Sequence, residues 1–182
     1  MSNTRPGGRS AIVKAKAFEA AQTLAIRHGL QNVTMPEIAK LAGIAPTSLY
    51  RRWGDVGSLL MEMAVERLTE ALPLPDEGSV AADLGLWAQR IAAGLNAAAP
   101  LSFFRVLLAT TDMSSEKRRE VLEPRLVQLQ QLLARSEARG ETVPSTAEVI
   151  DHLLAPLYLR SLLGMPLNDS YAAGLVRRLL TR

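Results

Sequence analysis

The chain has no cysteine among its 182 residues and only two histidines, His28 and His152. Disulfide bonds and thiolate-bound metal ions are therefore excluded, and a zinc site would depend on carboxylates. No apolar run approaches the ~20 residues that a membrane span needs, and the N-terminus shows no apolar secretion signal. From these absences we expect a cytoplasmic protein without a metal, a cofactor or a membrane partner.

The charged residues are distributed unevenly along the chain. Residues 1–53 hold eight basic side chains against two acidic ones, a net charge of +6, whereas the whole chain carries +3. A basic head on a mildly acidic remainder favours a polyanion as the partner of the head. Uneven sampling in an arginine-rich sequence would produce the same bias, so charge alone leaves both explanations open.

Helical signals recur throughout the sequence. Apolar residues are spaced three and four apart, no strand-length alternation is present, and no Asn-Gly or Asp-Gly hairpin signal occurs. The pattern predicts an all-α fold. Its glycines, prolines and capping residues divide the chain into helices at about 11–28, 34–41, 46–53, 56–72, 79–98, 101–111, 124–139, 145–163 and from Asn168 to the C-terminus. A segment at 114–122 leads into the helix at 124–139.

The clearest break in the chain is the segment Pro73-Leu74-Pro75-Asp76. It predicts a small N-terminal head followed by a larger helical body. The expected divisions are a flexible basic arm at residues 1–9, a three-helix head at 10–54, a connecting helix at 55–73 and the body at 74–182. The arm could reach into a DNA minor groove or be a disordered tail.

The segment from Thr34 to Trp53, TMPEIAKLAGIAPTSLYRRW, is typical of two short helices joined by a tight turn at Gly43. Thr34 can cap the first helix while Glu37 reaches back. Small side chains at the start of the second helix permit close approach to base edges, and hydroxyl and guanidinium groups bind phosphates. The outer face of that helix would carry Pro46, Thr47, Tyr50 and Arg51, with Ser48 and Arg52 at its edges.

An ordinary helical hairpin inside an all-α core is the alternative for this segment. The segment, however, resembles the helix-turn-helix of the TetR family of transcriptional regulators, which carries Thr-x-x-x-Ile-Ala-x-x-Ala-Gly-Val-Ser-x-x-x-Leu-Tyr-x-x-Phe. The resemblance is strong over residues 11–72 and weaker over 73–182, where the family has a variable effector domain. The matching residues are Thr34, Ile38, Ala39, Ala42, Gly43, Leu49 and Tyr50, with Ile44 for Val and Trp53 for Phe.

The resemblance implies an N-terminal three-helix helix-turn-helix head joined to a larger C-terminal helical effector and dimerisation domain. It implies a homodimeric, sequence-specific DNA-binding regulator, a repressor on a palindromic double-stranded operator, released by a small, largely apolar effector. The implied DNA-contacting residues are Thr34, Pro46, Thr47, Ser48, Tyr50, Arg51 and Arg52. Three positions depart from the family pattern: Ala45 replaces a Ser cap, Val56 a Lys and Gly57 a Glu.

The body contains two leucine-rich helices, at 124–139 and 145–163, that either pair with a second copy or form an internal core. The candidate dimer-interface residues are Leu126, Leu129, Leu133, Val149, Leu153, Leu157 and Arg160. Pro156 should kink its helix or free a carbonyl. Candidates for an effector pocket, equally explained as core, are Trp87, Ile91, Leu95, Phe103, Phe104, Leu107, Met113 and Tyr158.

No catalytic motif is present in the sequence. A Gly-rich phosphate loop, a His-Glu-x-x-His box and a Ser/His/Asp arrangement are all missing. We therefore do not expect an enzyme. A DNA-binding or scaffolding protein without an effector remains the alternative to an effector-controlled regulator.

Overall fold

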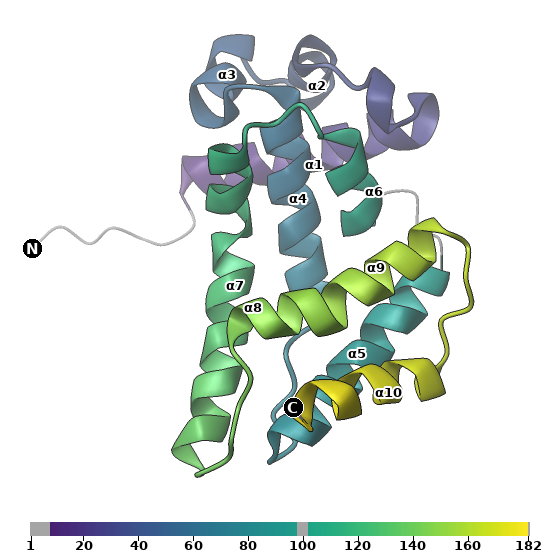
Figure 1. Ribbon diagram of the computed structural model, residues 1–182. Helices are drawn as coiled ribbons and strands as arrows, with labels where there is room; N and C mark the ends of the chain where they lie inside the picture. Colours follow the sequence, from purple (N-terminus) through teal and green to yellow (C-terminus); the bar gives the residue numbers. More distant parts are fainter. Residues whose placement is uncertain (1–7, 98–101, 182) are drawn as a thin grey trace, which may run out of the picture. The chain divides into compact units, whose positions relative to one another are not determined.

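The computed structural model describes residues 8–97 and 102–181, and every regular element in these ranges is helical, which confirms the predicted all-α class (Figure 1). Residues 1–7 of the expected basic arm lie outside the described ranges. The elements are α1 (Arg9–His28), η1 (Leu30–Asn32), α2 (Met35–Ala42), α3 (Pro46–Trp53), α4 (Val56–Ala71), α5 (Val80–Asn96), α6 (Phe103–Ala109), α7 (Ser115–Ala138), α8 (Thr146–Val149), η2 (Ile150–Leu154), α9 (Ala155–Leu162) and α10 (Asp169–Leu180).

The described residues form two compact units. The head unit comprises residues up to Glu66 together with Phe103–Val121, and the body unit comprises Arg67–Ser102 and residues from Leu122 onward. The sequence-based division did not place residues 103–121 with the head. This segment belongs with the head because α6 packs against η1. Within the segment, Arg118 closes the turn after α6 by donating from Nη2 to the carbonyls of Thr110 (3.1 Å), Thr111 (3.1 Å) and Met113 (3.2 Å).

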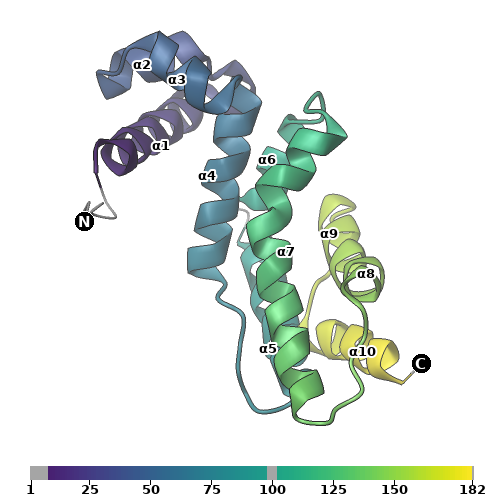
Figure 2. The same cartoon turned by 90° about the vertical axis from the view of Figure 1, so that its left-hand side faces the viewer.

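The head core is built on α1, α2 and α3, which lie against one another in both views (Figures 1 and 2). The rings of Phe18 of α1 and Trp53 of α3 pack in a tilted arrangement, with centroids 6.2 Å apart and an interplanar angle of 41°. Ile38 and Leu49 are fully buried beside them, and each such side chain stabilises the fold by about 1.5–3 kcal/mol relative to exposure. The Trp53 indole N–H donates to Glu62 of α4 at 2.8 Å, so its polar atom is satisfied as well.

The body core is formed by the inner faces of α5, α7, α9 and α10; α10 and α9 both pack on α5 (Figures 1 and 2). Two helix starts follow the capping chemistry expected from the sequence. Ser145 and Glu148 form a complete capping box at α8, and Asn168 accepts the N–H of Tyr171 at 2.8 Å to cap α10.

Helix α7 differs from the sequence-based expectation, which divided it into 114–122 and 124–139. The structure has a single helix, Ser115–Ala138, with Pro124 inside it. Proline has no backbone N–H, so the hydrogen bond to the carbonyl four residues earlier, that of Glu120, is missing. Both Glu120 and Pro124 are exposed, so that carbonyl can hydrogen-bond to water and the helix continues.

The helix predicted at 145–163 is interrupted by the π-turn η2. The Ala155 N–H bonds to the carbonyl of Ile150, five residues back, immediately before Pro156. Pro156 has no N–H to donate. It fits after this wider turn, because the backbone hydrogen bonds are already shifted by one residue there.

In the described residues no helix is both long and apolar enough to cross a membrane.

Candidate nucleic-acid interface

The turn between α2 and α3 is held by the backbone of Gly43. Gly43 has φ 65° and ψ 38°, in the left-handed region, and its N–H bonds to the Ala39 carbonyl. The Ile44 N–H reaches the same carbonyl at 3.0 Å. A residue with a Cβ adopts this conformation only with strain, so Gly43 fixes the angle at which α3 leaves α2.

Helix α3 buries one side and exposes the other, as its spacing predicts. Leu49 and Trp53 are buried at 0% and 3% exposure. Tyr50 is 47% exposed, and Pro46, Thr47 and Arg51 are exposed with it, whereas Ser48 is half-buried. The outer surface of α3 is therefore polar and cationic, with small side chains in its first turn.

The adjacent residues Arg51 and Arg52 are not equivalent. Arg52 turns back to α1, where Nη1 donates to the Ser10 hydroxyl at 2.7 Å and to its carbonyl at 3.1 Å. Its guanidinium carbon also lies 4.9 Å from the centroid of the Trp53 ring. Arg51 is exposed and has no hydrogen-bond partner within the described part of the chain. Arg51 is therefore available to an outside anion, whereas Arg52 holds α3 to the start of α1.

Thr34 occupies the N-cap position of α2, as expected, but its hydroxyl does not cap the backbone. The hydroxyl donates instead to the Glu37 carboxylate at 2.6 Å. Thr34 is exposed, and only rotation about its side chain separates this arrangement from one in which the hydroxyl faces an outside oxygen.

The departures at Ala45 and Gly57 have separate structural consequences. Ala45 provides no side-chain cap to α3. At α4, the missing Glu is replaced by Asp55, whose Oδ1 accepts the Ser58 N–H at 2.7 Å. A Cβ on Gly57 would lie 3.2 Å from that Asp55 oxygen and 3.6 Å from the Thr110 methyl carbon. Glycine at this position thus leaves room for the turn after α6.

The geometry of the head defines a class of protein: a helix-turn-helix DNA-binding regulator, with α3 as the recognition helix. Residues 17–63 match the family described as bacterial regulatory proteins, tetR family. Residues 74–179 match the tetracyclin repressor-like C-terminal domain. The chain belongs to the TetR family of transcriptional regulators, whose members are non-enzymatic DNA-binding proteins.

Curated relatives and solved structures agree with this assignment. The HTH-type transcriptional regulator AqdR of Rhodococcus erythropolis is 31% identical over 147 residues, which cover 80% of this chain and 71% of that protein. The HTH-type transcriptional regulator YdeS of Bacillus subtilis is 29% identical over 87% of this chain and 83% of its own length. The crystal structure of the TetR family regulator SCO0332 has the same fold, with a TM-score of 0.76, 23% identity and coverage of 93% of this chain and 97% of that one.

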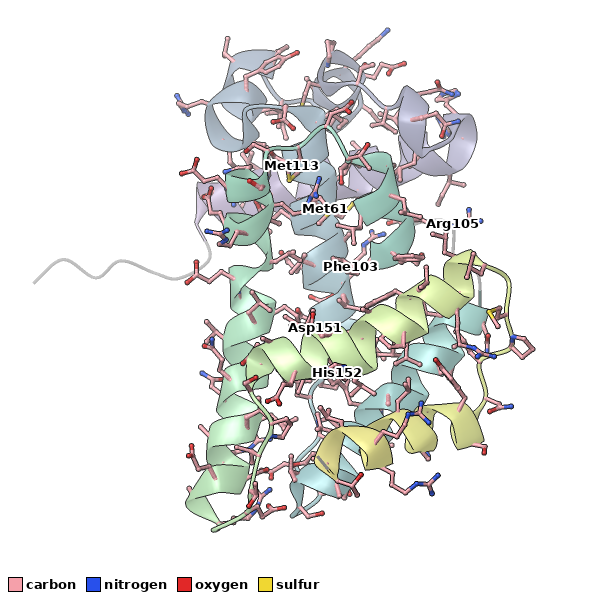
Figure 3. The ribbon with its side chains drawn as sticks, viewed as in Figure 1. Met61, Phe103, Arg105, Met113, Asp151 and His152 are labelled. Atoms are coloured by element: carbon pink, nitrogen blue, oxygen red, sulfur yellow. The ribbon has the colours of Figure 1, made fainter. Side chains whose placement is uncertain are left out.

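The predicted effector-pocket residues divide between the two units. In the body unit, Trp87 and Ile91 are each 3% exposed in the core, and Leu95 and Tyr158 pack against that core. In the head unit, Phe103, Phe104 and Leu107 lie half-buried on α6, and Met113 lies in the turn that leads to α7; Figure 3 labels Phe103 and Met113.

Five of the seven predicted dimer-interface residues lie in the body's own core. Their exposures are 2% for Leu129, 6% for Leu133 and 0% for Val149, Leu153 and Leu157. These side chains are covered by residues of their own chain, and their part in a dimer interface stays a prediction. Leu126 and Arg160 are half-buried. The exposed apolar residues near this end of the body are Leu159, Leu162, Leu163 and Met165.

The sequence reasoning missed a cleft of about 510 Å³ within the head unit, between the start of α4 and the turn after α6. Asp55, Gly57, Thr110 and Met113 are among its lining residues. No local pattern could have indicated it, because its walls are more than 50 residues apart in sequence. No group of three or more potential metal ligands occurs in the residues that the structure describes.

Proposed function

We propose that the protein is a homodimeric transcriptional repressor that binds a palindromic operator and is released by a small, largely apolar effector. The observation that carries the proposal is the outward face of α3, where polar and cationic side chains stand on a helix whose inner face is fixed by Leu49 and Trp53. Because operator DNA is its proposed ligand, we infer that the protein acts in the cytoplasm.

At the DNA, the first turn of α3 would approach base edges through Pro46 and Thr47. Tyr50 and Ser48 would contact the sugar-phosphate backbone, and Arg51 would bind a base or a phosphate. Thr34 would bind a phosphate at the start of α2. Arg52 could contribute only after exchanging its bonds with Ser10.

A dimer is part of the proposal because one recognition helix touches too few base pairs for useful specificity. The exposed apolar residues Leu159 and Leu162, each 55% exposed, supply a surface that a second copy would cover. The tetracyclin repressor-like family of the body supports the repressor assignment, and an effector that favours one conformation would lower the DNA-binding population.

A mobility-shift titration with the DNA upstream of the protein's own gene tests this proposal. We expect a specific complex whose affinity falls steeply with salt, as phosphate contacts require. The same titration on scrambled DNA of equal length measures non-specific binding. Absence of a specific shift at low salt, with folded dimer verified by sedimentation, would rule out the proposed operator.

A further inference from the structure

The body core contains a cation that it does not pair with an acid. Arg125 of α7 is 8% exposed. Its Nη1 donates to the Gln128 side chain at 3.0 Å and its Nη2 to the Leu72 carbonyl at 2.8 Å. Its Nε is buried and has no hydrogen-bond partner among the described residues, and none of the described carboxylates pairs with the guanidinium.

A second unpaired donor lies beside it. Trp87 of α5 is 3% exposed, and its indole N–H has no acceptor in the described part of the chain. The Arg125 guanidinium carbon lies 5.4 Å from the centroid of the Trp87 ring, so the guanidinium and the indole are neighbours in the body core. Buried indole N–H groups are ordinarily hydrogen-bonded, and two orphaned donors together mark a place that lacks an acceptor.

The same unit pairs its other buried charge. Asp83 is 0% exposed, and its Oδ1 accepts the Glu77 N–H at 2.5 Å. Its Oδ2 has no hydrogen-bond partner among the described residues but lies 3.6 Å from the Arg139 guanidinium as an ion pair. A buried guanidinium without a counter-charge is costly. Tyr158 does not supply the negative charge, because burial raises its pKa to about 12 and it remains a neutral phenol despite the nearby Arg125. Burial correspondingly lowers the pKa of Arg125.

We propose that Arg125 and Trp87 bind the carboxylate of the effector, which is therefore a monocarboxylic acid with an apolar remainder. The guanidinium supplies the charge and the indole a further hydrogen bond. The apolar remainder would enter the surrounding core, whose residues include Ile91 and Leu129, and this requires that core to open around the ligand. This inference rests on the proposed effector-controlled function and names the chemical class of the effector.

Thermal denaturation without DNA tests the inference directly. The probes are octanoate and 4-phenylbutanoate, each compared with its neutral carboxamide. We expect a saturable rise of about 3–5 °C at ten times the dissociation constant for at least one acid, and less than about 1 °C for its amide at the same concentration. Equal shifts for acid and amide, or no shift with either acid, would overturn the proposal.

Three variants locate the site. Arg125→Gln should abolish the acid-induced shift, and Trp87→Phe, which keeps an aromatic ring but loses the donor, should weaken acid binding about ten-fold. Arg135→Gln is the matched control: Arg135 lies on the same helix and also donates to a backbone carbonyl, that of Pro75 at 2.8 Å, so its loss should leave the shift intact.

A purely structural role for Arg125 predicts the opposite pattern, with lower stability but an unchanged acid response in each folded variant. If Arg125→Gln does not fold, the Trp87→Phe variant provides the test. An acid affinity of Trp87→Phe equal to that of the unaltered protein would overturn the proposal. Since these melts contain no DNA, a failure of operator binding in the mobility-shift titration is distinguishable from a failure of the acid site.

Discussion

Helices α3 and α9 are both eight residues long and both carry proline in the first turn, yet they expose opposite chemistry. The outer face of α3 presents hydroxyl groups and Arg51. The outer face of α9 presents Leu159 and Leu162, each 55% exposed. A polar, cationic helix suits a polyanion, whereas an exposed apolar patch suits another protein surface. The two units of the chain therefore offer surfaces for different kinds of partner.

The bonds that hold distant segments together are more alike in the two units. In the head, side chains of distant segments bind one another: Lys14 with Glu62 at 3.1 Å, and Arg52 with Ser10 at 2.7 Å. In the body, Arg139 lies 3.6 Å from Asp83, and Arg125 donates to the Leu72 carbonyl at 2.8 Å. Both units therefore use charged side chains to hold distant segments, and the contrast between them lies in their exposed helices.

The largest expected effect separates the two faces of α9. Leu157→Ala should lower the free energy of unfolding by about 2–5 kcal/mol, because Leu157 is fully buried. Leu159→Ala should change it by less than about 0.5 kcal/mol in the monomer while weakening self-association. Urea unfolding and sedimentation at several protein concentrations measure both quantities. Equal losses of stability in Leu157→Ala and Leu159→Ala would mean that both faces of α9 are packed within the monomer.

The next effect tests the non-equivalence of the two arginines of α3. Arg51→Ala should weaken operator binding by about 1–3 kcal/mol, or roughly ten-fold to over a hundred-fold, with an unchanged melting temperature. Arg52→Ala should lower the stability of the head, because it removes two hydrogen bonds to Ser10. Arg177→Ala, an exposed arginine of α10, is the charge-matched control in mobility-shift titrations. Loss of stability in Arg51→Ala would instead indicate a core role.

Local signals predicted most of the fold. Apolar spacing, the glycine at 43 and the caps at Ser145 and Asn168 act within a few residues, so helix ends came out close to their observed positions. The continuation of α7 through Pro124 was not predicted, because a proline's effect depends on whether the carbonyl that it deprives of a partner reaches water.

Distant contacts were beyond local patterns. Helical spacing placed Arg51 on the outer face and Arg52 at its edge, but it could not indicate that Arg52 binds Ser10, 42 residues away. The leucine stripe of α7 and α9 likewise has the same spacing whether it faces its own core or a second copy. A signal at Arg125 was present, since an arginine stands three residues after Leu122 and four before Leu129, on the inward side of an apolar stripe.

A smaller effect concerns the helix caps of the two units. Ala45→Ser should stabilise the head by about 0.5–1 kcal/mol, because it supplies the cap that α3 lacks. Ser145→Ala should destabilise the body by about 1 kcal/mol, because it breaks the capping box at α8. Chemical denaturation measures both. A loss of stability in Ala45→Ser would show that the added hydroxyl prefers another partner.

The smallest effect is an acid dependence of stability at Glu141 in the body. The Val80 N–H, aided by Arg139 and opposed by desolvation, lowers the pKa of Glu141 below its usual 4.5. A carboxyl whose pKa is depressed in the folded state contributes stability that is present above the unfolded pKa and is lost as pH falls through the folded value. Melting temperatures between pH 6 and pH 3 should therefore fall less steeply in Glu141→Gln than in the unaltered protein. Glu137→Gln, on the exposed side of α7, controls for the loss of one negative charge. Matching slopes for Glu141→Gln and the unaltered protein would show that the bond to Val80 does not depend on the ionisation of Glu141.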